Sequence, residues 1–127
     1  MAGAPKHILV VDDDGDVLET IVAALQERGY RVTASSGGVS MRAAIINPDL
    51  LDAIVLDASM PGENTASLAL HAKDRKLPVV MISGSPTLMK FALDNGLQLL
   101  MKPFKIDELY AAIDKALASG EFGQRDA

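Results

Sequence analysis

Four aliphatic runs in this sequence end in side chains that can bind a metal ion or react with a phosphoryl group. Three carboxylates follow the first run, and a carboxylate, a hydroxyl and an ammonium follow three later runs: Asp12, Asp13, Asp14, Asp57, Ser83 and Lys102. Each group alone has an ordinary explanation, as a helix cap, a turn residue or a solvated charge. Groups of this kind at the ends of four strands, all at the same edge of a sheet, are not expected of surface residues without a function, so we interpret them as one site.

The aspartates of this rim do not all need the same explanation. One carboxylate suffices to cap the helix that follows the triplet, and we assign that role to Asp14. If Asp12, Asp13 and Asp57 converge, two carboxylates about 4 Å apart repel by about 1 kcal/mol in water and by about 4 kcal/mol near a protein surface. A proton taken up with a raised pKa or a bound divalent cation relieves this repulsion. Mg²⁺ fits best, because it takes one or two carboxylates and completes its shell with water and phosphate oxygens.

A phosphate-bearing partner is therefore expected at this rim. A phosphoryl group bound there would meet the metal ion, the Lys102 ammonium and the Ser83 hydroxyl, which is the arrangement that in-line phosphoryl transfer requires. Asp57 stands alone in the sequence and is the candidate nucleophile. Its product would be an acyl phosphate.

The runs that carry these groups predict the strands of a parallel sheet. Five apolar runs alternate with helical patterns, at residues 8–11, 30–34, 54–56, 79–82 and 97–101. The helical patterns cover residues 17–25, 39–46, 65–74, 87–95 and 106–118. Gly29 can end the first helix in the left-handed conformation. Together these elements predict an α/β fold with helices on both faces of the sheet and a ligand site outside the carboxyl ends of the strands.

Composition limits the classes of function. The 127 residues, 49% apolar and 23% charged, predict one folded domain, which we place at residues 1–119, with a polar tail at residues 120–127. The net charge of −5 argues against nucleic-acid binding. The sequence has no cysteine, which excludes disulfides and thiolate metal sites. No apolar run is long enough for a membrane span or a secretory signal, so we expect a cytoplasmic protein.

Four segments together resemble the receiver domain of bacterial two-component response regulators, over about residues 6–118. They are Ile-Leu-Val-Val-Asp-Asp-Asp at 8–14, Leu-Asp-Ala-Ser-Met-Pro-Gly at 56–62, Met-Ile-Ser-Gly at 81–84 and Lys-Pro-Phe at 102–104. The resemblance implies a flavodoxin-like sheet of five parallel strands in the order 2-1-3-4-5. It also implies a phosphorylated signalling switch rather than a turnover enzyme.

The resemblance also assigns roles to individual residues. Asp57 would accept a phosphoryl group from a sensor histidine kinase or a histidine phosphotransfer protein. Asp13 and the backbone carbonyl of Ser59 would bind Mg²⁺, with Asp57 itself and with Asp12 helping through water. Lys102 and Ser83 would contact the phosphoryl oxygens, and the proline after Lys102 would follow a cis bond.

Three departures from the family pattern concern the response rather than the chemistry. Leu99 stands where the family commonly has an aromatic residue that turns inward on activation. Asn64 and Thr65 replace a common Asp-Gly pair, so the start of the third helix is expected to differ. Nineteen positions separate Ser83 from Lys102, fewer than is usual, which shortens the fourth helix or the loop before it.

Two alternatives stay open at this point. A haloacid dehalogenase-type phosphatase would use Asp12 as nucleophile and Asp14 as acid and base, but it leaves Asp57 unexplained. A receiver-like binding module would never be phosphorylated. As a receiver, the chain is expected to act alone on a protein target that binds the surface of the fourth helix, fifth strand and fifth helix. We expect Ser83 to move toward the phosphoryl group and to draw residues 84–86 with it.

Overall fold

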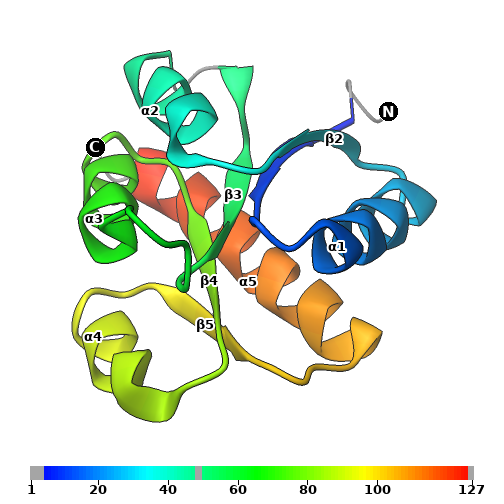
Figure 1. Cartoon of the computed structure of the whole chain (residues 1–127). Coiled ribbons are helices and arrows are strands. Elements are labelled where there is room, and N and C mark those ends of the chain that lie inside the picture. The colour runs from blue at the N-terminus through cyan, green and yellow to red at the C-terminus, as the bar shows by residue number, and fades with distance from the viewer. Residues whose placement is uncertain (1–4, 48–49, 126–127) are drawn as a thin grey trace.

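The computed structural model describes residues 5–47 and 50–125 and shows strands and helices in alternation (Figure 1). The elements, in chain order, are β1 (His7–Val11), α1 (Gly15–Glu27), β2 (Arg31–Ser35), α2 (Gly38–Ile46), β3 (Ala53–Asp57), α3 (Thr65–Asp74), β4 (Val79–Ser83), the 3-10 turn η2 (Pro86–Leu88), α4 (Met89–Asp94), β5 (Gln98–Met101) and α5 (Ile106–Arg125).

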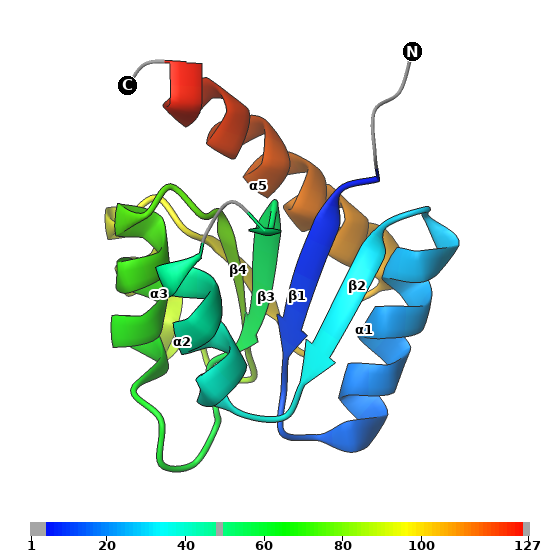
Figure 2. The same ribbon diagram turned by 90° about the horizontal axis from the view of Figure 1, so that it is seen from above.

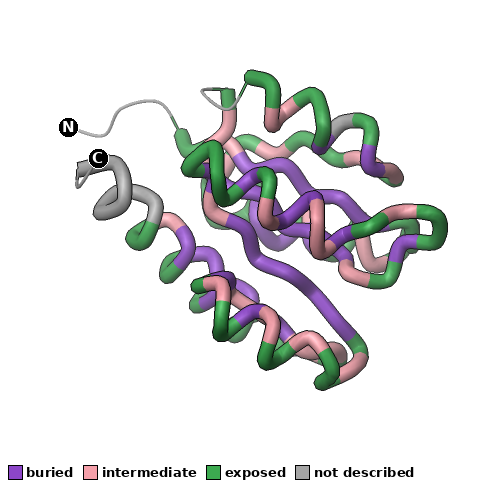
Figure 3. The backbone as a smooth tube through the Cα atoms, turned by 90° about the vertical axis from the view of Figure 1, so that its left-hand side faces the viewer, coloured by how far each residue is buried: buried purple, intermediate pink, exposed green. Residues whose placement is uncertain are grey.

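The five strands form one parallel sheet in the order β2-β1-β3-β4-β5, which confirms the predicted order. β3 and β4 are buried at every residue and β1 at every residue but the first, whereas the edge strand β2 is largely exposed. Figure 3 shows this burial along the backbone tube, with exposed residues on the outer sides of the helices. Continuous apolar runs in the inner strands are what a parallel sheet covered on both faces requires.

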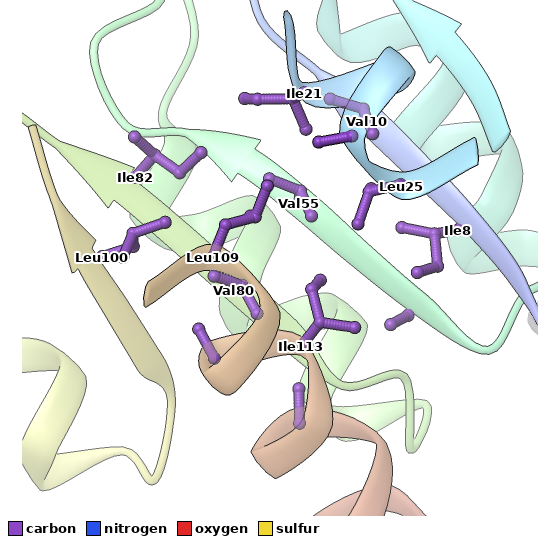
Figure 4. Close-up of a cluster of buried hydrophobic side chains, with 14 residues drawn as sticks. Ile8, Val10, Ile21, Leu25, Val55, Val80, Ile82, Leu100, Leu109 and Ile113 are labelled. Carbon is purple, nitrogen blue, oxygen red and sulfur yellow. The ribbon is translucent and has the colours of Figure 1, made fainter. Parts of the chain in front are cut away.

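Helices cover both faces of the sheet, as predicted (Figure 2). α1 and α5 pack on one face, with buried residues that include Ile21 and Ile113, and this core is drawn in Figure 4. α2, α3 and α4 pack on the other face. Alternate residues of β1 point into the two cores, since Val10 belongs to the first and Val11 to the second. Each fully buried aliphatic side chain of this kind contributes about 1.5–3 kcal/mol to stability.

Several element boundaries differ from the predictions by one or two residues, and two of the differences have a visible cause. The second strand begins at Arg31 rather than Tyr30, because the Tyr30 amide donates to the carbonyl of Leu25 at 3.1 Å and so belongs to the cap of α1. Gly29 has a φ of +91° there, as the sequence predicted. The predicted helix over residues 87–95 is divided into η2 and α4, and the Ser85 hydroxyl accepts the Thr87 amide at the start of η2.

The last helix is longer than predicted. It was expected to end at Ala118 and runs through Arg125, so the backbone of most of the predicted polar tail is helical. A glycine inside a helix costs about 1 kcal/mol relative to alanine, and that does not end a helix already nucleated over three turns. Residues 126–127 of the predicted tail lie outside the described residues. Among the residues that the structure describes, no helix combines the length and the apolar character needed to cross a bilayer.

Candidate functional site

The register of the sheet brings the predicted residues to one edge. Val11 pairs with Leu56, so the next residues along β1 and β3, Asp12 and Asp57, lie side by side at the carboxyl ends. One oxygen from each of Asp12, Asp13 and Asp57 lies within 4.8 Å of the other two. The three carboxylates therefore converge as the sequence predicted.

Lys102 also reaches this edge. Its backbone amide donates to the Ser83 carbonyl at 2.8 Å, and its Nζ lies 3.8 Å from Asp57 Oδ1 and 3.9 Å from Asp12 Oδ2. The peptide bond between Lys102 and Pro103 is cis, as predicted. One ammonium thus faces two carboxylates, and negative charge remains in excess at the site.

The carboxylates differ in their exposure. Asp12 and Asp57 are 1% and 2% exposed, and Asp13 is exposed. Burial, with the nearby charge of Asp57, raises the pKa of Asp12 to about 6, although the hydrogen bond from the Asp14 amide and the charge of Lys102 lower it. A buried carboxylate without full compensation favours its neutral form in this way.

The geometry fits a hard divalent cation. Asp12 Oδ1 accepts the Asp14 amide at 2.9 Å, but Asp12 Oδ2 is buried and has no hydrogen-bond partner among the described residues. The contact of Oδ2 with Lys102 at 3.9 Å is longer than a hydrogen bond. A buried carboxylate oxygen of this kind is stabilised by a proton or a bound cation, and three carboxylates with mixed burial offer the oxygen donors that Mg²⁺ prefers.

The Asp57 carboxylate is held by the chain that follows it. Asp57 Oδ1 accepts the Ser59 amide at 3.0 Å, and the Ala58 amide donates to the Ile82 carbonyl of β4 at 2.8 Å. The β3–α3 loop is therefore hydrogen-bonded both to the phosphoacceptor candidate and to the neighbouring strand. The assignment of the Ser59 carbonyl as a metal ligand stays a prediction.

Two other predicted residues have local partners. Asp14 caps α1, because its Oδ1 accepts the amides of Asp16 at 3.0 Å and Val17 at 3.2 Å, and this confirms the capping role. Ser83 is 3% exposed at the end of β4. Its hydroxyl donates to the Ser85 carbonyl at 2.9 Å and accepts the Ser85 amide at 3.0 Å, so it is engaged by its own loop.

Two residues at the start of α3 and in the loop before it, Thr65 and Glu63, escaped the sequence analysis as functional candidates. Thr65 is buried, and its hydroxyl donates to the Ala58 carbonyl at 2.9 Å. Glu63 accepts a hydrogen bond from the Gly38 amide at 3.2 Å and also pairs with Arg42. The N-cap residue of α2 makes no side-chain hydrogen bond, so the Glu63 carboxylate caps the start of this helix instead. A Cβ at Gly38 would lie 2.5 Å from Glu63 Oε2. The only sequence signal was the departure from the family pattern at positions 64 and 65.

Comparison with known proteins gives a consistent family. The model described as the response regulator receiver domain matches residues 8–114. The transcriptional regulatory protein PrrA of Mycobacterium tuberculosis is 40% identical over 117 residues, which are 87% of this chain and 49% of PrrA. The transcriptional regulatory protein GlrR of Escherichia coli is 33% identical over 125 residues, 92% of this chain and 27% of GlrR. The chain thus spans half or less of these curated relatives.

Solved structures agree with the sequence relatives. The receiver domain of the sensor histidine kinase PA1611 from Pseudomonas aeruginosa, with a magnesium ion coordinated in its active site cleft, superposes with a TM-score of 0.76 at 27% identity, covering 91% of this chain and 99% of that one. A CheY-like response regulator receiver domain protein from Methanospirillum hungatei superposes with a TM-score of 0.81 at 27% identity, covering 94% and 98%.

Proposed function

Since this chain belongs to the response regulator receiver domain family, we propose that it is a signalling switch that accepts a phosphoryl group on Asp57. The donor is a sensor histidine kinase or a histidine phosphotransfer protein. The observation that carries the proposal is the position of Asp57, a buried carboxylate that shares its site with two further carboxylates and lies 3.8 Å from the Lys102 ammonium. No side-chain set elsewhere among the described residues combines three carboxylates in this way.

The proposed reaction transfers one phosphoryl group. An Asp57 carboxylate oxygen attacks the phosphorus of a phosphohistidine, the P–N bond breaks, and its electron pair stays on the imidazole, which takes up a proton. The product is an acyl phosphate on Asp57. The Lys102 ammonium is placed to stabilise the charge on the transferring oxygens. A groove of about 510 Å³ next to the site is lined by Lys102, Phe104 and residues of α1.

In this proposal Asp12, Asp13 and Asp57 hold Mg²⁺ together with the Ser59 carbonyl. When bound, the ion supplies positive charge to the carboxylates and to the phosphoryl oxygens. The buried Asp12 Oδ2, which has no hydrogen-bond partner within residues 5–47 and 50–125, supports this assignment.

Ser83 is the proposed sensor of the phosphoryl group. Its hydroxyl must leave the Ser85 carbonyl to donate to a phosphoryl oxygen, and this exchange releases the Ser85 amide as well. Moving a two-state equilibrium from 1:99 to 99:1 needs about 5.5 kcal/mol. Two charge-assisted hydrogen bonds to the phosphoryl group, from Ser83 and Lys102, would supply about 1.5–3 kcal/mol each and so most of this free energy.

The proposed output is a protein that binds the surface of α4, β5 and α5, where Met89 and Leu93 are 45% and 74% exposed.

The structure weakens the support for the phosphatase alternative. That alternative needs Asp14 as acid and base, but Asp14 Oδ1 accepts hydrogen bonds from two amides of α1. It also leaves the buried Asp57 without a role. Single acceptance of a phosphoryl group, without turnover of phosphate esters, is therefore the proposed activity.

The test mixes the protein with Mg²⁺ and a small acyl-phosphate donor and measures intact mass. We expect one hydroxylamine-labile phosphoryl adduct, which Asp57→Asn lacks and which the matched control Asp114→Asn, in the exposed ion pair between α1 and α5, retains. An adduct that survives in Asp57→Asn would contradict the proposal. Sustained phosphate-ester hydrolysis that Asp12→Asn abolishes and Asp57→Asn spares would establish the phosphatase instead.

A further inference from the structure

Thr65 makes a contact with the site that the proposed function does not use. It is the first residue of α3 and only 6% exposed, and its Oγ1 donates to the carbonyl of Ala58 at 2.9 Å. The bond closes the β3–α3 loop across seven positions, back to the residue directly after Asp57. Thr65 therefore does more than start α3, because its buried hydroxyl also holds the loop that carries Asp57.

The carbonyl that Thr65 holds belongs to the peptide unit that also holds Asp57. A peptide unit is planar, so the Ala58 carbonyl and the Ser59 N–H point in opposite directions from one rigid plate. Thr65 binds one side of the plate, and Asp57 Oδ1 accepts the Ser59 N–H on the other side at 3.0 Å. Rotation of this plate would turn the Ser59 N–H away from the carboxylate. Bonds at both ends of a peptide unit also polarise it, which strengthens each of them.

The rest of the loop keeps Thr65 in place. Asn64 caps α3, since its Oδ1 accepts the Ser67 amide at 3.0 Å, so the helix start is fixed next to Thr65. Met60 is 5% exposed and packs in the core beneath α3. The β-branched side chain of threonine has few χ1 choices, which keeps its hydroxyl in one direction.

We propose that Thr65 is a positioning residue for the phosphorylation of Asp57. Through the Ala58–Ser59 peptide it orients the Asp57 carboxylate for attack. The inference rests on the proposed function for its rate effect, but the orientation itself is measurable without any phosphoryl donor.

The test compares Thr65→Val, which removes the hydroxyl and keeps the shape, with Thr65→Ser, which keeps the hydroxyl. Thr65→Ala is a second hydroxyl-free variant in case the valine variant does not fold. Tyr110→Phe is the matched control, because it removes another hydroxyl-to-carbonyl bond of 2.9 Å, to Ala24, far from the site. The two readouts are amide exchange of Ser59 in the metal-free protein and the rate of adduct formation with Mg²⁺ and the small donor.

We expect Thr65→Val to speed exchange of the Ser59 amide and to slow adduct formation, each about threefold to tenfold, the effect of one hydrogen bond. Thr65→Ser should restore both, and Tyr110→Phe should change neither while it lowers stability. Wild-type values of both readouts in Thr65→Val, or a failure of Thr65→Ser to restore them, would overturn the inference. If the wild type forms no adduct, the proposed function fails, and Ser59 exchange alone decides whether Thr65 orients the carboxylate.

Discussion

Two charged clusters of this molecule are built in opposite ways. Between α1 and α5, Arg28 Nη1 lies 3.4 Å from Asp114 Oδ2, and the guanidinium lies 4.4 Å from the centroid of the Tyr110 ring. At the carboxyl edge of the sheet, three carboxylates lie near one ammonium, that of Lys102, whose Nζ is 3.8 Å from Asp57 Oδ1 and 3.9 Å from Asp12 Oδ2.

The difference between the clusters lies in compensation as well as in number. The α1–α5 cluster balances one cation with one carboxylate, and both are well exposed, at 40% and 55% of their side chains. The site buries two carboxylates almost fully, and in the part of the chain that the structure describes Asp12 Oδ2 has no hydrogen bond. A cluster that only joins two helices can be satisfied within the chain. A cluster with excess buried negative charge can bind a cationic ligand, but without that ligand the uncompensated charge lowers the stability of the fold.

The largest expected effect comes from removing divalent cations. If the excess charge of the site is reserved for Mg²⁺, chelation with EDTA should slow adduct formation by about a hundredfold or more, since a metal ion supplies several kcal/mol of charge stabilisation. Time courses of intact mass before and after added MgCl₂ measure the effect. If the rate of adduct formation were the same in EDTA, the excess charge of the site would not be reserved for Mg²⁺, and this difference between the two clusters would have no functional meaning.

The next effect concerns stability. Because the pKa of Asp12 is raised from 3.8 to about 6 in the folded protein, its protonation stabilises the fold fully below about pH 4, and this contribution is lost as the pH rises through about 6. In the absence of metal, Asp12→Asn should therefore raise the free energy of unfolding at pH 7.5 by about 1–3 kcal/mol.

Urea unfolding at pH 7.5 and pH 4 measures this change. The gain should shrink at the lower pH and should shrink again when Mg²⁺ stabilises the wild type. Asp114→Asn is the comparison variant, and it should show neither dependence. A variant Asp12→Asn that is less stable than the wild type at pH 7.5 would contradict the account of buried excess charge.

A smaller effect is expected in the loop after β4. When a phosphoryl mimic draws the Ser83 hydroxyl away, the Ser85 amide loses its acceptor, and its hydrogen exchange should become about tenfold faster. Ser83→Ala should show fast exchange at Ser85 with and without the mimic. Identical protection of the wild-type loop in the two states would refute the proposed movement.

The smallest effect should come from the α1–α5 cluster. Asp114→Asn breaks an exposed ion pair, so we expect a loss of about 0.2–1 kcal/mol in the free energy of unfolding. Adduct formation should be unchanged. A loss of phosphorylation in this variant would mean that the two clusters are coupled through α5.

Much of this protein follows from its sequence alone. The continuous apolar runs predicted five parallel strands, because inner strands of a parallel sheet are buried on both faces, and the resemblance to the receiver family implied their order. Polar residues at the ends of those runs predicted the convergence of Asp12, Asp13 and Asp57. The capping role of Asp14 and the left-handed Gly29 were also readable, since each depends only on neighbours within a few residues.

Other features were decided by contacts between segments far apart in the chain. The hydrogen bond of the Tyr30 amide to the Leu25 carbonyl of α1 moved the start of β2. Whether the Ser83 hydroxyl faces its own loop or the carboxylates depends on a rotamer that no pattern encodes. The bond from Thr65 to Ala58 exists only because the β3–α3 loop folds back on itself, and the raised pKa of Asp12 exists only because the sheet buries it. Local patterns determine which residues stand at the strand ends, whereas burial and side-chain direction are set when the layers pack.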